Sequence, residues 1–163
     1  MDNLVLFVDL DGSLKSEHGE DGPYEVPSIT VQSGPIKYVF AARPHLHEFL
    51  DMASKKAIRM ILCTAAGGGY ARKVLKAMNI DGYFTDIIAA EDYVKGFPIR
   101  PNWNCIFIDN DQEMVNLKVE RLSEKSLISS YKRATMSTWV IDTYHGEKDD
   151  KVLLELMEEI ENL

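Results

Sequence analysis

Three short apolar runs, each followed directly by residues with side-chain oxygens, constrain the fold of this chain more than any other feature. The runs cover residues 4–8, 58–63 and 105–108. A strand that is apolar along its whole length is typical of a parallel sheet whose two faces are both covered by helices. The sequence therefore predicts an α/β fold with a mainly parallel central sheet, which a fourth run at residues 138–141 would join.

Helical spacing of apolar residues predicts the helices between these strands. One helix opens at Arg43-Pro44, a second follows the three glycines at 67–69, a third runs from residue 112 through Leu122, and the last spans about 149–163. Residues 24–31 and 36–41 read as a hairpin with its turn at 32–35. We expect residues 1–163 to form a single domain, in which 15–42 insert a loop and a small hairpin flap after the first strand.

The net charge, the length of the apolar runs and the positions of the cysteines indicate which partners and which cellular compartment to expect. The 163 residues carry 26 acidic and 18 basic side chains, so the formal net charge is −8, which disfavours general binding to nucleic acid. No apolar run approaches the roughly 20 residues that cross a bilayer. Cys63 and Cys105 lie inside apolar runs and read as buried thiols. We expect an intracellular protein without a membrane partner, cytoplasmic, or nuclear in a eukaryote.

The residues that end the apolar runs predict a cation site. Asp9 and Asp11 follow the first run, and Asp109 with Asn110 follows the third. Ligands bind at the carboxyl ends of the strands in an open parallel sheet, so these oxygens meet at one edge. Carboxylates that converge without a His or Cys partner favour Mg²⁺. Each of these residues taken alone would more often be a turn residue or a helix cap; the combination is what indicates a site.

The second run ends in residues suited to a phosphate. Thr64 and Ala65 precede a glycine-rich turn that opens a helix, where a hydroxyl and backbone N–H groups can hold phosphate oxygens. Lys95 would supply a compensating charge, and Lys73 is a weaker candidate for that role. Carboxylates, a cation, a hydroxyl and a lysine are together the groups that phosphoryl transfer uses.

At these residues the chain resembles a known family. Residues 7–14, FVDLDGSL, look like the DxDx(T/S) nucleophile motif of the haloacid dehalogenase superfamily of phosphatases. Residues 43–50, Cys63-Thr64-Ala65-Ala66 and Ile108-Asp109-Asn110 resemble, more narrowly, the RNA polymerase II C-terminal-domain phosphatases, also called the NLI-interacting-factor-like family. Ser13 stands where that motif usually has Thr, and Gly12 where this family usually has Glu.

The resemblance implies a Rossmann-like fold without a large cap and an aspartyl-phosphate mechanism. Asp9 would be the nucleophile and Asp11 the general acid and base. Asp9, the backbone carbonyl of Asp11, Asp109 and Asn110 would hold Mg²⁺, while Thr64, Ala65 and Lys95 would bind the phosphoryl oxygens. The implied substrate is phosphoserine or phosphothreonine in a protein or peptide.

Two other classes of function stay open at this point. One is a phosphatase of nucleotides or nucleic-acid 3′-ends, which the acidic net charge disfavours. The other is a non-enzymatic module, either a receiver domain or a binding domain. Receivers place the acceptor aspartate on a middle strand, whereas here the acid pair comes first in the chain. The sequence does not say whether Lys95 or Lys73 binds phosphate, or what residues 112–137 do.

Overall fold

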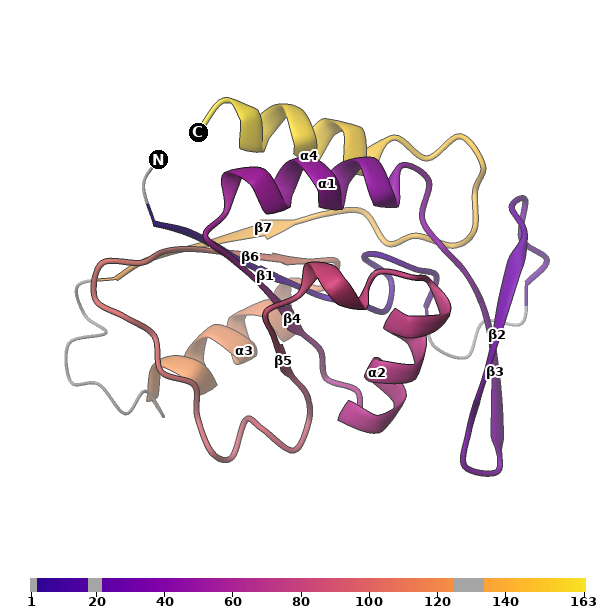
Figure 1. Ribbon diagram of the computed structural model, residues 1–163, viewed down its shortest axis with the longest axis horizontal. Coiled ribbons are helices and arrows are strands. Elements are labelled where there is room, and N and C mark those ends of the chain that lie inside the picture. The colour runs from indigo at the N-terminus through magenta and orange to yellow at the C-terminus, as the bar shows by residue number, and fades with distance from the viewer. Residues whose placement is uncertain (1–2, 18–21, 125–133) are drawn as a thin grey trace.

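The computed structural model describes residues 3–17, 22–124 and 134–163, and a five-stranded sheet lies at its centre. The strands are β1 (Leu4–Val8), β4 (Arg59–Cys63), β5 (Asp86–Ile88), β6 (Asn104–Asp109) and β7 (Thr135–Val140). They lie in the order β5-β4-β1-β6-β7, and every neighbouring pair is parallel (Figure 1). The mainly parallel α/β sheet expected from the apolar runs is therefore confirmed.

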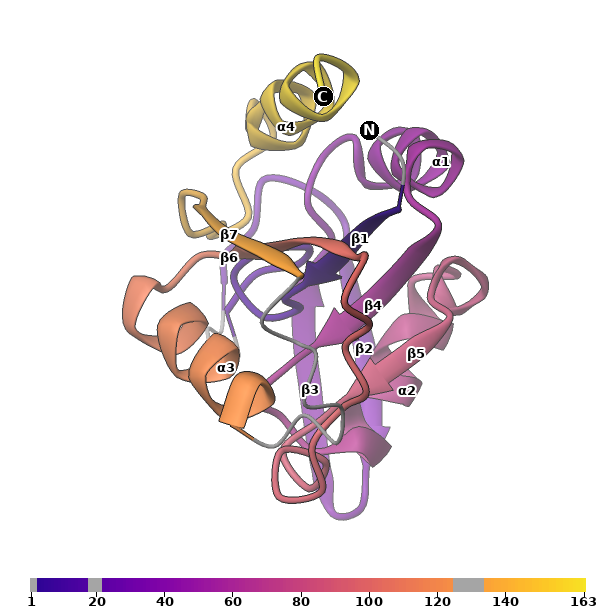
Figure 2. The same ribbon diagram turned by 90° about the vertical axis from the view of Figure 1, so that its left-hand side faces the viewer.

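Helices cover both faces of this sheet, as Figure 2 shows from the end of the strands. They are α1 (Leu46–Lys56), α2 (Gly68–Ala77), α3 (Gln112–Glu124) and α4 (Val152–Glu161). Alternate residues of β1 enter different layers: Leu6 packs in the cluster that contains α1, α2 and α4, whereas Phe7 packs in the cluster that contains α3. Because both faces are covered, β1 is buried along its whole length. The residue that follows the strand directly in the sequence is the polar Asp9.

Most helices have the expected apolar face, but some element ends differ from the prediction. The buried residues of α1 are those predicted: Leu46, Phe49, Leu50 and Ala53. The last helix begins at Val152, three residues later than predicted. Strand β5 and the single turn of 3₁₀ helix η1 (Asp81–Tyr83) were not predicted, because three residues are too few to show a period.

The predicted flap is a separate two-stranded sheet of β2 (Ser28–Ser33) and β3 (Ile36–Ala41). It lies beside α2, where the rings of Tyr38 and Tyr70 are 4.8 Å apart (Figure 1). The turn contains only Gly34 and Pro35, and the positive φ of 59° at Gly34 suits such a two-residue loop. Strand β2 begins four residues later than predicted, directly after Pro27, which has no N–H to contribute to a strand ladder.

Two further expectations concern the chain as a whole. Within the described residues, no helix combines the length and the apolar character needed to span a bilayer. The helix predicted from residue 112 is present as α3. The polar connection predicted after it falls largely on residues 125–133, which lie outside the described residues.

Candidate active site

Asp9 lies at the carboxyl end of the central strand and is buried. Its backbone N–H donates to the carbonyl of Ile108 at 2.9 Å, which extends the pairing between β1 and β6 by one residue. The Asp9 carboxylate accepts two hydrogen bonds from side chains. Ser13 Oγ lies 3.0 Å from Oδ2, and Lys118 Nζ lies 2.8 Å from Oδ1. These bonds hold the carboxylate in one orientation.

Lys118 of α3 joins the two acidic strand ends. Its ammonium donates to Asp9 Oδ1, to Asp109 Oδ2 at 2.6 Å and to the carbonyl oxygen of Cys63 at 2.8 Å. An ammonium has three N–H donors, so all of them are used. Lys118 is only 3% exposed, and a lysine is found so deeply buried only when it is paired in this way.

Burial and the neighbouring charges shift the pKa values of Asp9 and Lys118. Burial raises the pKa of Asp9, while the Lys118 ammonium acts in the opposite direction and the nearby Asp109 adds to the rise. Burial alone would lower the pKa of Lys118, but the attraction of the neighbouring acidic groups outweighs it and the pKa is raised. Lys118 is therefore a permanent cation at neutral pH, placed between two carboxylates.

The two lysines predicted from the sequence form no described hydrogen bond or ion pair with Asp9 or Asp109. Lys95 lies on an exposed turn, and the described ion pairs of Asp9, Asp11 and Asp109 are with Lys15 and Lys118. Lys73 donates from α2 to the carbonyl of Gln32 in the hairpin at 3.3 Å. The ammonium in contact with Asp9 comes from Lys118, a residue that the sequence analysis did not name.

A signal for Lys118 was present in the sequence. Val115 and Leu122 are the buried apolar residues of α3, and Lys118 is three residues after the first and four before the second. Residues at such spacings share one helix face. A lysine on the buried face of a helix that follows an acidic strand end indicates an ion pair beneath the helix.

Asp11 lines the same cavity and has its own cation. Its Oδ1 accepts from Lys15 Nζ, with which it forms an ion pair, and from Tyr70 Oη at 3.0 Å. Lys15 is 1% exposed, donates also to the carbonyl of Ser16 at 2.7 Å, and lies 4.8 Å from the centre of the Phe40 ring. Asp11 is thus held in place from the flap side of the site, whereas Asp9 is held from α3.

Thr64 and Asn110 complete the wall of the cavity. Thr64 follows β4, and its Oγ1 accepts from the backbone N–H of Ala66 at 3.1 Å. Asn110 accepts from Ser13 Oγ at 3.2 Å and donates to Glu17 Oε1 at 2.9 Å. The cavity has a volume of about 170 Å³. Its lining includes every predicted site residue other than the lysines: Asp9, Asp11, Thr64, Ala65, Asp109 and Asn110.

The local geometry explains the glycine that departs from the family motif. Gly12 has a φ of +81°, a left-handed conformation that residues with a side chain rarely adopt. A Cβ at this position would collide with the amide of Asn110 and with the carboxylate of Glu17. Gly12 therefore allows Asn110 to lie against the loop that carries Asp9 and Asp11.

The oxygen atoms of the site suit a hard cation that keeps some of its waters better than a metal ion enclosed entirely by protein ligands. Within the described ranges, no cluster of three or more His, Cys, Asp or Glu side chains has metal-binding geometry. Mg²⁺ needs only one or two carboxylates and keeps waters at its other positions. Asp9 Oδ2 and Asp109 Oδ1 each accept one hydrogen bond, from Ser13 and from the N–H of Asp111, and a carboxylate oxygen has a second lone pair. These residues therefore fit Mg²⁺.

Comparison with known proteins agrees with this site. The sequence matches the family of NLI interacting factor-like phosphatases over residues 4–163. The chain belongs to this family. This NLI interacting factor-like phosphatase is accordingly a hydrolase of phosphoric monoesters, and the family predicted from the motifs is confirmed.

Solved structures show the same fold at low sequence identity. The core domain of a protein assigned as a phosphoglycolate phosphatase, from Streptococcus pneumoniae, is 18% identical with a TM-score of 0.52, over 100% of this chain and 98% of that one. The HAD domain of the effector protein Lem4 from Legionella pneumophila, an inactive mutant, is 14% identical with a TM-score of 0.51, over 96% and 91%. Comparison with curated protein sequences gives no match.

Proposed function

We propose that this phosphatase removes phosphate from phosphoserine or phosphothreonine in a flexible protein segment, through an aspartyl-phosphate on Asp9 and with Mg²⁺ bound. The observation that carries the proposal is the pairing of two aspartates with different partners. Asp9 is buried against Lys118 and Ser13, and Asp11, two residues later, lines the same cavity and contacts Lys15 and Tyr70. This difference in partners supports Asp9 as the nucleophile and Asp11 as the group that transfers protons.

In the first step a carboxylate oxygen of Asp9 forms a bond to phosphorus, and the bond from phosphorus to the ester oxygen breaks. The departing oxygen takes its proton from Asp11. Lys118 keeps Asp9 oriented through Oδ1, and its positive charge offsets the charge on the transferring phosphoryl group. The Thr64 hydroxyl and the N–H of Ala65 bind phosphoryl oxygens at the cavity wall.

In the second step a water attacks phosphorus and gives its proton to Asp11, which is restored to its acid form. The bond between phosphorus and the Asp9 oxygen breaks, so inorganic phosphate and the free carboxylate are released. Asp9, the backbone carbonyl of Asp11 and Asp109 would hold Mg²⁺, with Asn110 supporting the ion or its water. When bound, the ion neutralises charge on the phosphate and keeps the two carboxylates from repelling each other.

The size of the flap supports a macromolecular substrate. The β2–β3 hairpin is the insertion after the first strand, and no large cap accompanies it. A site without a cap can receive a phosphate displayed on an extended chain, whereas a site beneath a cap favours small molecules. A phosphorylated peptide or protein is therefore the partner we propose.

A phosphatase of nucleotides or nucleic-acid 3′-ends is the second candidate, because an open site admits these phosphates as well. The formal charge of −8 opposes the approach of a polyanion. Hydrolysis rates on a phosphoserine peptide and on a 3′-phosphorylated oligonucleotide at equal concentration would separate the two. A faster rate on the oligonucleotide would overturn the proposed substrate.

The chemistry itself is tested with p-nitrophenyl phosphate in the presence of Mg²⁺ or of EDTA. We expect metal-dependent turnover that is lost in Asp9→Asn and kept in Asp149→Asn, an exposed carboxylate that serves as control. Mass spectrometry of acid-quenched protein should detect a phosphoryl group on Asp9 during turnover. Wild-type turnover by a folded Asp9→Asn variant would show that another residue is the nucleophile.

A further inference from the structure

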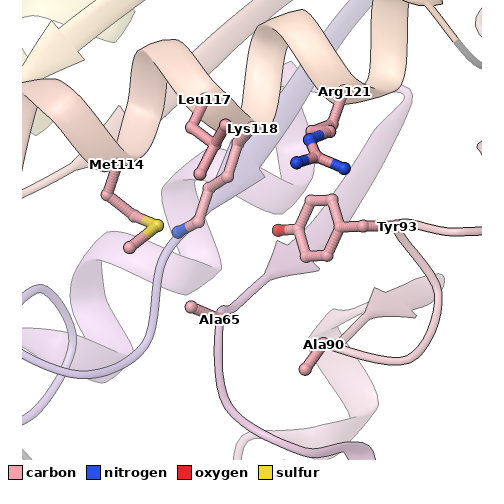
Figure 3. A pocket seen from close by; sticks show the side chains of 7 residues that line it. All are labelled: Ala65, Ala90, Tyr93, Met114, Leu117, Lys118 and Arg121. Atoms are coloured by element: carbon pink, nitrogen blue, oxygen red, sulfur yellow. The ribbon is translucent and has the colours of Figure 1, made fainter.

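A second cavity adjoins the reaction cavity, and of its lining residues only Ala65 and Lys118 take part in the chemistry described so far. It has a volume of about 260 Å³ and lies between α3 and the turn that follows β5 (Figure 3). Ala65 and Met114 line both cavities, so the two are neighbours along one surface. A substrate whose phosphate is at Asp9 can therefore extend into it.

The walls of this cavity, which we name the side pocket, are mainly apolar. Its lining residues are Ala65, Ala90, Tyr93, Met114, Leu117, Lys118 and Arg121. The Lys118 ammonium is used by its three acceptors in the reaction site, so Lys118 offers the side pocket its hydrocarbon stem. The Tyr93 hydroxyl is similarly engaged, 3.1 Å from the sulfur of Cys63. The interior therefore selects an apolar group.

Arg121 adds one positive charge at the end away from the reaction cavity. In Figure 3 its guanidinium lies near Tyr93, whereas Met114 lies at the opposite end of the row formed by α3. Met114, Leu117, Lys118 and Arg121 follow helical spacing on one face of α3. Seven residues of helix correspond to roughly 10 Å, so Arg121 is about that distance along the helix from the shared wall.

These dimensions fit a single side chain and its neighbour. Pockets that enclose a whole drug-sized ligand have volumes of roughly 300–1,000 Å³, and the side pocket is smaller. In an extended peptide, residues two apart point to the same side and are separated by roughly 7 Å. A residue two positions from the phosphorylated one would thus reach the side pocket, and the next part of the chain would reach Arg121.

We infer that the side pocket binds a large apolar side chain of the substrate peptide, two residues from the phosphorylated residue, and that Arg121 binds a carboxylate beyond it. This inference rests on the proposed function. Leu117 supports it, because this leucine lines the pocket, is 43% exposed, and would lose contact with water when a peptide covers it. The charge of Arg121 supports the carboxylate, since the chain as a whole is acidic and gives little other attraction for an acidic peptide.

The test compares phosphoserine peptides that differ at one residue. One series carries Leu two positions from phosphoserine, on the N-terminal or the C-terminal side, and the reference carries Ala at the same place. We expect kcat/KM to be about tenfold or more higher for Leu on one of the two sides, the usual effect of burying one such side chain. The preference should fall close to unity in Leu117→Ser.

Ile58→Ser is the matched control for Leu117→Ser. Ile58 is also an exposed aliphatic residue, at 53%. It precedes β4 and so lies at the amino ends of the parallel strands, whereas the reaction cavity lies at their carboxyl ends. We expect this variant to keep the wild-type preference for Leu. Equal loss of preference in both variants would overturn the assignment of the side pocket.

The carboxylate is tested with a second pair of peptides, which have Glu or Gln after the Leu. The preference for Glu should disappear in Arg121→Gln and in high salt, and should remain in Arg72→Gln, which alters an exposed arginine of α2 outside the pocket lining. If wild type hydrolyses p-nitrophenyl phosphate but none of the peptides, the proposed substrate fails. If it hydrolyses the Leu and Ala peptides equally well, the proposed substrate stands and the side pocket inference fails.

Discussion

Arg43 and Asp150 form a bidentate ion pair, in which Nε of the arginine lies 2.8 Å from Oδ1 of the aspartate and Nη2 lies 2.9 Å from Oδ2. The same guanidinium donates to the carbonyl of Ser13 at 3.0 Å and to that of Asp142 at 2.8 Å. It thereby connects the loop that carries Asp9 and Asp11 to the segment leading into α4. Arg43 is among the largest fully buried side chains, so its charge depends on these partners.

We therefore expect Arg43→Met to destabilise the protein strongly. Removing one partner of a buried ion pair lowers the free energy of unfolding by about 3–5 kcal/mol, and here Asp150, which is 11% exposed, would lose its countercharge. Urea denaturation followed by circular dichroism measures this change. Arg59→Gln is the control: Arg59 forms a half-exposed pair with Asp86 at 3.6 Å, and its loss should change the same free energy by less than about 1 kcal/mol. Similar losses in the two variants would contradict the prediction.

The contact between Lys118 and Asp9 gives a second prediction. Lys118→Met removes the cation that orients Asp9, so kcat on p-nitrophenyl phosphate should fall by about 10²–10³-fold. Lys95→Met removes only an exposed charge and should stay within about twofold of wild type. Steady-state kinetics on the folded variants decides between the two lysines. Loss of activity in Lys95→Met alone would return the role to that residue.

The two roles of Asp11 can be separated through the leaving group. p-Nitrophenolate departs without a proton, so Asp11→Asn should still form the aspartyl-phosphate but hydrolyse it about 10²–10⁴-fold more slowly. Stopped-flow absorbance should then show a burst of nitrophenolate followed by a slow steady rate. With a phosphoserine peptide, both the formation and the hydrolysis of the aspartyl-phosphate need Asp11. No burst of dephosphorylated peptide is therefore expected. Equal slowing on both substrates without a burst would argue against Asp11 as the base.

The cysteines give a prediction about pH. Burial raises the pKa of Cys63 to about 11 and that of Cys105 to about 12. At pH 8 both thiols stay protonated, so Ellman's reagent should react slowly with the folded protein and quickly in denaturant. The folded thiols also keep protons that the unfolded chain releases above about pH 9, so stability should fall as the pH rises from about 9 to 11. Rapid reaction of the folded protein at pH 8 would contradict this burial.

The strands and their acidic ends were predictable because burial on both faces leaves a simple pattern in the sequence. The apolar run 4–8 favoured a strand buried on both faces of a parallel sheet, which places Asp9 at the carboxyl end of that strand. The grouping of Asp9, Thr64 and Asp109 follows from parallel pairing alone. These residues form a site through the sheet, and the sheet is what the sequence describes best.

Lys118 and Lys15 were not predictable in the same way, because their positions depend on how surrounding elements pack on the sheet. Both lysines are fully enclosed, although lysine is among the residues most often exposed. Lys95 was favoured because it matches a short motif, which carries no information about side-chain direction. The face of α3, occupied by Val115 and Leu122, was the feature that distinguished Lys118.

The contact between the flap and the acid has a consequence for how this enzyme can change. Phe40 of β3 lies against the Lys15 ammonium, and the same ammonium binds Asp11. The flap is thus joined to Asp11, the proposed general acid and base, through Lys15 and, by the contact of Tyr38 with Tyr70, through a second side chain that binds the same carboxylate. We expect variation at Phe40 to alter the rate of the chemical step, whereas variation at the tip of the hairpin, near Gly34, leaves the contact between Phe40 and Lys15 intact. New substrate preferences can therefore evolve at the tip of the flap without loss of the reaction.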